Sequence, residues 1–142
     1  MWQPVLDGKL FFTQYLRLRV AYLMDRGLPA ETTESMRQRL QAGGTVEVAG
    51  YLLSGCIAAD LDAKRLADMT DLRGLEIGWF EHVSEAGKAL SAPGQKAIEH
   101  LRGQSCTVDA QTYVGAPIWQ LHDRDQVPQL VELTTELFRG RP

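Results

Sequence analysis

The sequence predicts an α/β fold with a small, mainly parallel sheet. Its strongest signal is a strand, a helix and a strand in succession over residues 75–114, which together form one βαβ unit. Along the whole chain, at most four short strands and about five helices occur in mixed order, as in the α/β class. We therefore expect the two strands of the unit to pair in parallel, with the helix crossing over between them.

The first 70 residues are predicted to form the end of a strand and a set of cap-like helices. Pro4 restricts the first strand to a sheet edge, and Ser54 is a suitable N-cap for a helix. Elsewhere the helices are predicted from apolar residues at helical spacing and the strands from alternation. In chain order, the predicted elements of this half are the strand end at 2–5, helices at 9–25 and 31–41, a strand at 45–53 and a helix at 54–67.

The βαβ unit is bounded by residues with clear conformational preferences. Ser91 is a helix cap, Pro93 suits a first helical turn and Gly103 ends the helix. The predicted elements of this half are strands at 75–83 and 106–114, the crossover helix at 92–102 and an amphipathic last helix from Pro128.

Length and composition favour a single α/β domain over residues 1–142, with the strand end and cap-like helices in 1–70 and the βαβ unit and last helix in 71–142. The formal net charge of -3 provides no basic field for nucleic acid. No apolar run approaches the roughly 18 residues of a membrane span, and no signal peptide is apparent, so we expect a cytoplasmic protein. The two cysteines form no CxxC pair, and we expect neither a metal nor a cofactor.

Ligands of parallel sheets bind beyond the carboxyl ends of the strands, so we expect chemistry in the loops at 84–90 and 115–126. Aromatic side chains supply most of the area of small-molecule sites. We predict that a ligand pocket is lined by residues of the first helix together with Tyr51, Phe80, Trp119 and Gln120.

Several segments are similar, in the same order, to α/β-hydrolase-fold proteins, and the group they resemble most is the exosortase-associated hydrolases among the serine-aminopeptidase-like esterases. These segments are Trp2-Gln3-Pro4-Val5 with Gly8-Lys9, residues 13–18, residues 46–54, and Gly115-Ala116-Pro117-Ile118-Trp119-Gln120. The resemblance runs nearly end to end, but onto only the C-terminal half of that fold.

The resemblance implies that the catalytic nucleophile is missing. In this fold it sits on a G-x-S-x-G elbow, which would precede Trp2, and neither Ser54 nor Ser84 has the glycines that such an elbow needs. The resemblance places the acid after the first strand of the βαβ unit, at Glu81 or Glu85. It places the base in the loop after residue 114, where His122 is the nearest histidine. His122 beside Asp123 and Asp125 could also form a weak metal cluster, or belong to a polar loop that caps the last helix.

Two function hypotheses follow. The first is a hydrolase-derived domain that is not catalytic alone and binds a small molecule or a protein partner. The alternative is a self-sufficient ester hydrolase with Ser54, Ser84 or Cys56 as nucleophile and His82 or His122 as base. A third possibility is a partner chain that supplies the missing half together with its nucleophile. The absent elbow favours the first hypothesis.

We also expect a homodimer. An incomplete sheet presents an unpaired edge, and the first helix carries many large apolar side chains for one surface element. These side chains are Phe11, Phe12, Tyr15 and Leu16. Self-association by sheet-edge pairing or by packing of first helices would remove them from water.

Overall fold

The structure is a computed structural model that describes residues 1–116 and 126–139. The chain forms two compact units. The sheet unit consists of Met1–Leu6 and Met69–Pro142, and the hairpin unit consists of Asp7–Asp68. The described residues contain five α-helices and four strands in mixed order, so the α/β class is confirmed. That residues 1–142 act as one domain stays a prediction.

The sheet unit is built on the predicted βαβ unit. Strand β3 (Glu76–Val83) pairs in parallel with β4 (Thr107–Val114) along its whole length, from Glu76↔Thr107 to Val83↔Val114. Helix α4 (Ala92–Gly103) connects them, and the Ser91 side chain accepts a hydrogen bond from the Gly94 amide as its N-cap. The parallel pairing and the crossover helix are therefore confirmed.

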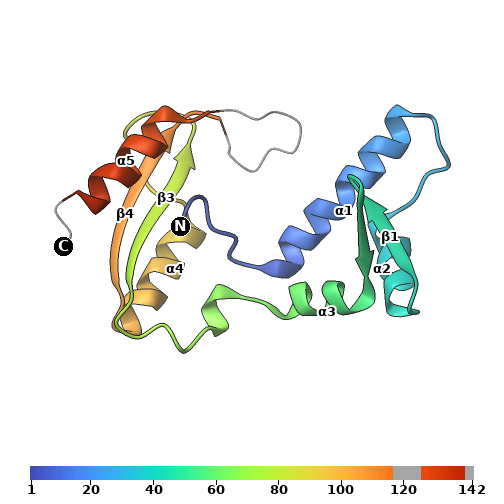
Figure 1. The fold of residues 1–142 in the computed structure, drawn as a ribbon, viewed down its shortest axis with the longest axis horizontal. Helices are drawn as coiled ribbons and strands as arrows, with labels where there is room; N and C mark the ends of the chain where they lie inside the picture. Colours follow the sequence, from blue (N-terminus) through green and yellow to red (C-terminus); the bar gives the residue numbers. More distant parts are fainter. Residues whose placement is uncertain (117–125, 140–142) are drawn as a thin grey trace. The chain divides into compact units, whose positions relative to one another are not determined.

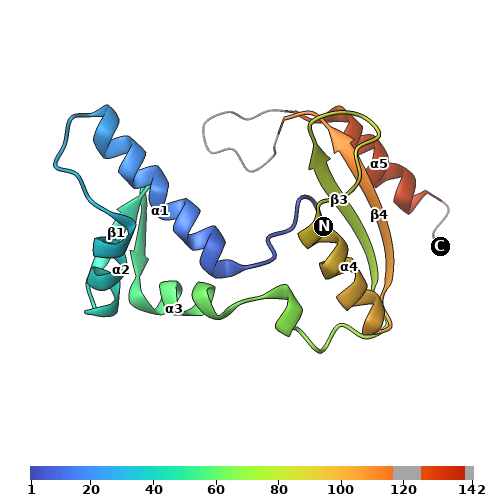
Figure 2. The same ribbon diagram turned by 180° about the vertical axis from the view of Figure 1, so that it is seen from behind.

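Helices cover both faces of the β3–β4 pair (Figure 1, and from behind in Figure 2). The Glu81 side chain reaches the start of α4, which places α4 on the face of the odd-numbered β3 residues. Helix α5 (Pro128–Phe138) packs on the opposite face, where Phe80 and Tyr113 form a core cluster with Leu130. Gly78 allows this close packing, since a Cβ atom there would lie 2.3 Å from a Leu137 methyl group.

The predicted strand end at the N-terminus is present only as an isolated bridge. Trp2 pairs in parallel with Phe80: the Phe80 amide donates to Met1 O at 3.0 Å, and the Gln3 amide donates to Phe80 O at 2.7 Å. This segment lies beside β3, on the side away from β4.

The hairpin unit corrects the expectation of one mainly parallel sheet. Residues 45–53, predicted as a single strand, form an antiparallel hairpin of β1 (Thr45–Val48) and β2 (Tyr51–Ser54). The turn residues Ala49 and Gly50 both have positive φ angles, 51° and 83°, as a two-residue hairpin turn requires. The part of the chain that the structure describes therefore has two separate two-stranded sheets, one antiparallel and one parallel.

Three helices complete the hairpin unit: α1 (Gly8–Asp25), α2 (Thr33–Gln41) and α3 (Gly55–Ala63). The prediction that the third helix extends to residue 67 was wrong. Lys64 is extended because its carbonyl accepts a hydrogen bond from the Gly8 amide at 2.8 Å, which ties the end of α3 to the start of α1. Ser54 precedes α3 as predicted, but its side chain makes no capping hydrogen bond.

The apolar face of α1 is largely internal to the hairpin unit. Phe12 and Leu16 are fully buried, so the expectation that both are exposed was wrong. They pack with a cluster from the other elements of the unit, which contains Met36, Leu40, Val46, Val48, Leu53 and Ala58. Only Phe11, at 39% exposure, keeps a wide apolar surface among the four side chains expected there.

The contact between α1 and α3 depends on the absence of a side chain at Gly8. A Cβ atom at Gly8 would lie 2.0 Å from the Leu61 carbonyl oxygen, which belongs to the backbone and has little room to move. We predict that Gly8→Ala lowers the free energy of unfolding by about 1–3 kcal/mol, measured by urea denaturation. Gly103→Ala is the matched control, because a Cβ atom there meets nothing within 4 Å. An equal effect of both substitutions would contradict the packing described.

Candidate functional site

The predicted acid, Glu81, is used to fix the start of α4. Its Oε1 accepts a hydrogen bond from the Ser91 amide at 2.8 Å, and its Oε2 lies 3.4 Å from Trp79 Nε1. Gly94 approaches so closely that a Cβ atom there would lie 2.2 Å from Oε2. A carboxylate at a helix N-terminus is favoured by the unpaired amides and the helix dipole. Glu81 therefore acts as a structural anchor in this arrangement.

The other polar side chains at the carboxyl end of β3 are also engaged. His82 Nε2 lies 2.7 Å from Gly115 O, and the His82 ring meets the Tyr113 ring edge-on at 5.7 Å between centroids. Ser84 Oγ accepts a hydrogen bond from Lys88 Nζ at 3.0 Å. Among the described residues, no histidine ring is hydrogen-bonded to Ser84, so the structure forms no nucleophile–base pair there.

Ser54 and Cys56 lie together in the hairpin unit. Ser54 Oγ is 2.9 Å from Cys56 Sγ at the start of α3, and Cys56 is exposed. Residues 7–68 contain no histidine, because the chain's three histidines are His82, His100 and His122. A histidine base for either nucleophile candidate would therefore have to come from the sheet unit.

Three of the predicted site residues lie outside the described residues. They are Trp119, Gln120 and His122. Their roles as ligand-binding residues and as a catalytic base stay predictions.

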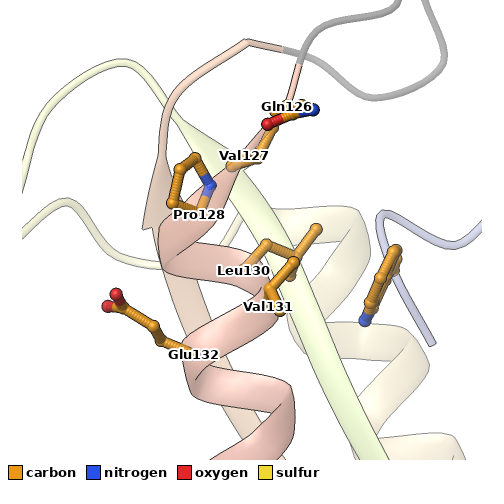
Figure 3. Close-up of a pocket in the computed structure, with 7 residues that line it drawn as sticks. Gln126, Val127, Pro128, Leu130, Val131 and Glu132 are labelled. Atoms are coloured by element: carbon orange, nitrogen blue, oxygen red, sulfur yellow. The ribbon is translucent and has the colours of Figure 1, made fainter.

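A shallow groove is present in the sheet unit, between the Trp2 segment and the start of α5 (Figure 3). Its volume is about 480 Å³, and its lining consists of Trp2, Gln126, Val127, Pro128, Leu130, Val131 and Glu132. Leu130 and Val131 project from the same side of α5, whereas Glu132 projects from the other side. The wall is mainly apolar and open, since Val131 is 55% exposed and Trp2 is 41% exposed.

The Trp2 side of the groove is held by a hydrogen bond across the sheet unit. Trp2 Nε1 donates to Thr134 Oγ1 at 2.8 Å, which fixes the indole ring against α5. Trp2 and the residues of α5 are not among the site residues predicted from the sequence. The amphipathic pattern of α5 indicated which side chains face the sheet, but it carried no signal that an N-terminal tryptophan would lie beside them.

The hairpin unit has an aromatic patch, formed by Phe11, Tyr15 and Tyr51. The Phe11 and Tyr15 rings stack at 6.3 Å between centroids, and Tyr15 OH donates to Val48 O at 3.3 Å. Tyr51 is the strand partner of Val48 and is 69% exposed. Burial, followed by the neighbouring Tyr51 hydroxyl, raises the pKa of Tyr15. Tyr51 thus lies in the same unit as the first helix, and its role in ligand binding stays a prediction.

Phe80 has a different environment from Tyr51. It is 1% exposed and packs in the core of the sheet unit against Tyr113 and Leu130. Its ring lies beneath α5, not on a surface that a ligand reaches. The sequence identified Phe80 as a large aromatic residue next to a strand end, but could not distinguish a core position from a pocket wall.

Within residues 1–116 and 126–139, no group of three or more histidine, cysteine or acidic side chains could hold a metal ion. In the same residues, no helix is long and apolar enough to cross a bilayer. Comparisons of the chain with family models, with curated proteins and with solved structures find no match.

The structural use of Glu81 can be tested by stability. Removing its carboxylate leaves the Ser91 amide without its acceptor, so we predict that Glu81→Ala lowers the free energy of unfolding by about 1–2 kcal/mol. The matched control is Glu85→Ala, because Glu85 is exposed in the following loop and should change stability by less than about 0.5 kcal/mol. Chemical denaturation measures both, and a neutral Glu81→Ala would contradict the anchoring role.

Proposed function

We propose that this chain is a hydrolase-derived binding module that does not catalyse ester hydrolysis by itself. The proposal extends the resemblance to the C-terminal half of the α/β-hydrolase fold. The observation that carries it is the apolar groove of Trp2, Val127 and Val131, which is open next to the carboxyl end of the parallel strands. In open α/β sheets this end is the usual place for ligands.

The contacts of the catalytic candidates support a non-catalytic role. Triad chemistry needs a nucleophile within hydrogen-bond reach of a base, and the base oriented by an acid. Glu81 is engaged with α4, His82 with Gly115 O and Ser84 with Lys88. Each candidate is thus directed to a neighbour other than a triad partner.

The ligand that best fits the groove is a neutral apolar molecule, or an apolar side chain of a protein partner. The indole of Trp2 offers a flat face, and the Val127, Pro128 and Val131 side chains provide aliphatic walls. Burying an aliphatic or aromatic group there would gain roughly 25 cal/mol per Å² of apolar surface. Glu132 and Gln126 are the polar residues of the rim.

The alternative of a self-sufficient hydrolase is favoured by one observation, the 2.9 Å contact between Ser54 Oγ and Cys56 Sγ. Such a pair would need a base and an oxyanion hole to become reactive. The hairpin unit has no histidine to supply the base.

We predict that the chain neither turns over p-nitrophenyl acetate nor reacts with a serine-directed fluorophosphonate probe. The physical reason is that no described serine is activated by a base. Activity is followed by release of p-nitrophenol, and labelling by mass spectrometry of the intact protein. Labelling at Ser54 or Ser84, or turnover lost in Ser54→Ala, Ser84→Ala or Cys56→Ala, would establish the hydrolase alternative instead.

Binding in the groove is tested with Nile red, a neutral aromatic dye whose fluorescence rises in apolar surroundings. We predict that Val131→Glu weakens dye binding about tenfold, because it removes apolar wall area and adds a charge that must be desolvated. Phe138→Glu is the control, since Phe138 lies at the far end of the same helix and is 61% exposed. Equal binding by the parent protein and Val131→Glu would rule out the groove as the dye site.

The proposal includes a homodimer that buries the aromatic patch. Phe11 and Tyr51 are 39% and 69% exposed, and together with Tyr15 they give the hairpin unit a larger apolar surface than isolated residues would. We predict a dimer in sedimentation velocity at micromolar concentration and a shift toward monomer in Tyr51→Glu. The matched variant Met24→Glu changes a 74% exposed residue elsewhere on α1 and should leave the mass unchanged. A monomeric parent protein would contradict the dimer.

A further inference from the structure

Strand β4 is an edge strand in the part of the chain that the structure describes. Its one neighbour is β3, and the Thr107 amide donates to Leu75 O across that pairing at 2.9 Å. Because alternate residues of a strand direct their backbone groups to opposite sides, the residues that direct their amides and carbonyls away from β3 follow from this bond. They are Val108, Ala110, Thr112 and Val114.

Both ends of this outer edge are occupied by side chains of the flanking helices. From α4, Arg102 Nη2 donates to the Val108 carbonyl at 3.0 Å. From α5, Gln129 Oε1 accepts from the Val114 amide at 2.9 Å. One helix on each face of the sheet therefore sends one side chain to one end of the edge.

The sequence of β4 favours pairing of its open edge with a strand of another chain. Asp109 is the one charged residue of β4. The five residues after it, 110–114, carry no charge and include Thr112, Tyr113 and Val114, which all favour strands. An edge stretch of this kind can pair with another chain, and proteins protect such edges with charged side chains or by covering them. Arg102 and Gln129 are positioned to do this.

The Val108 carbonyl and the Val114 amide, which these side chains occupy, would bond to each other if two copies of β4 paired about a two-fold axis. If β4 of a second copy paired in antiparallel fashion about an axis at Gln111, Ala110 would lie opposite Thr112 and Val108 opposite Val114. In a hydrogen-bonded antiparallel pair, opposing residues exchange both amide–carbonyl bonds. The Val114 amide of one copy would then donate to the Val108 carbonyl of the other. These are the two groups that Gln129 and Arg102 occupy.

We propose that Arg102 and Gln129 form an edge lock that prevents β4 from pairing with β4 of a second copy. The lock acts by occupying the donor and the acceptor that close the outer bonds of the antiparallel register. With both in place, only Ala110 and Thr112 remain between the locked ends, which is too short a stretch for a stable strand pairing.

The lock is tested with Arg102→Ala/Gln129→Ala in sedimentation velocity at 100 µM, against the parent protein in the same buffer. The expected result is an average mass at least twice that of the parent, with amide exchange at Ala110 and Thr112 slowed at least tenfold. Arg102→Ala/Gln129→Glu is the rescue variant, because its carboxylate still accepts from the Val114 amide. Its mass should match that of the parent.

A proline at the pairing edge provides the second control. Ala110→Pro in the double-alanine background removes an outward amide while leaving the β3 side intact, so association should be lost. An unchanged mass of the double variant, association of the rescue variant, or association that survives Ala110→Pro would each overturn the edge lock. If circular dichroism shows that the double variant is unfolded, Arg102→Met/Gln129→Leu replaces it, because these side chains keep the apolar stems but cannot make the two hydrogen bonds. The same rise in mass is expected, and an unchanged mass would overturn the proposal.

Discussion

The parallel pairing of β3 with β4 is the constraint on which the sheet unit depends. Two parallel strands cannot be joined by a tight turn, so the chain must cross over, and α4 is that crossover. Parallel strands are normally covered on both faces, and α5 supplies the second cover. The amphipathic helix α5 is thus required by the same pairing that α4 makes possible. Gly78 and Gly94 are close-contact positions on the two faces: a Cβ atom at Gly78 would meet Leu137 of α5, and one at Gly94 of α4 would meet Glu81 of β3.

This constraint explains why the side chains at the carboxyl end of β3 are structural. The crossover must begin close to the strand end, which exposes the first amides of α4 to the last residues of β3. Glu81 accepts a hydrogen bond from the Ser91 amide at the start of α4. His82 makes a similar contact with the chain after β4, where its Nε2 lies within hydrogen-bond distance of Gly115 O. Residue types that are common in catalysis are therefore explained here by helix and loop termination. The groove beside Trp2 remains open because α5 packs on the sheet with Leu130, while Val131, on the same side of the helix, is exposed.

Most of the sheet unit could be predicted from sequence because its signals are local. Alternation in 75–83, the Ser91–Pro93 start, the Gly103 end and Pro128 each act within one turn or one strand. The hairpin unit was less predictable, since its boundaries are set by contacts distant in sequence. The third helix ends at Ala63 because Lys64 bonds to Gly8, and Phe12 and Leu16 are buried because α2 and the hairpin cover them. The candidate site was less predictable. Phe80 is a core residue, and the Trp2 groove depends on two contacts that are distant in sequence, the bridge to Phe80 and the hydrogen bond to Thr134.

The edges of the parallel sheet determine which modes of self-association are open to the protein. On the β3 side, Met1 and Gln3 take the backbone groups of Phe80. On the β4 side, Arg102 and Gln129 occupy the ends of the strand. Sheet-edge pairing, one of the two routes to a dimer that the sequence allowed, is thus opposed on both sides by contacts within the sheet unit itself. The aromatic patch of the hairpin unit has no such protection, because Phe11 and Tyr51 are exposed and uncharged. If the chain associates with itself, the balance of these surfaces therefore favours the aromatic patch over the sheet as the interface.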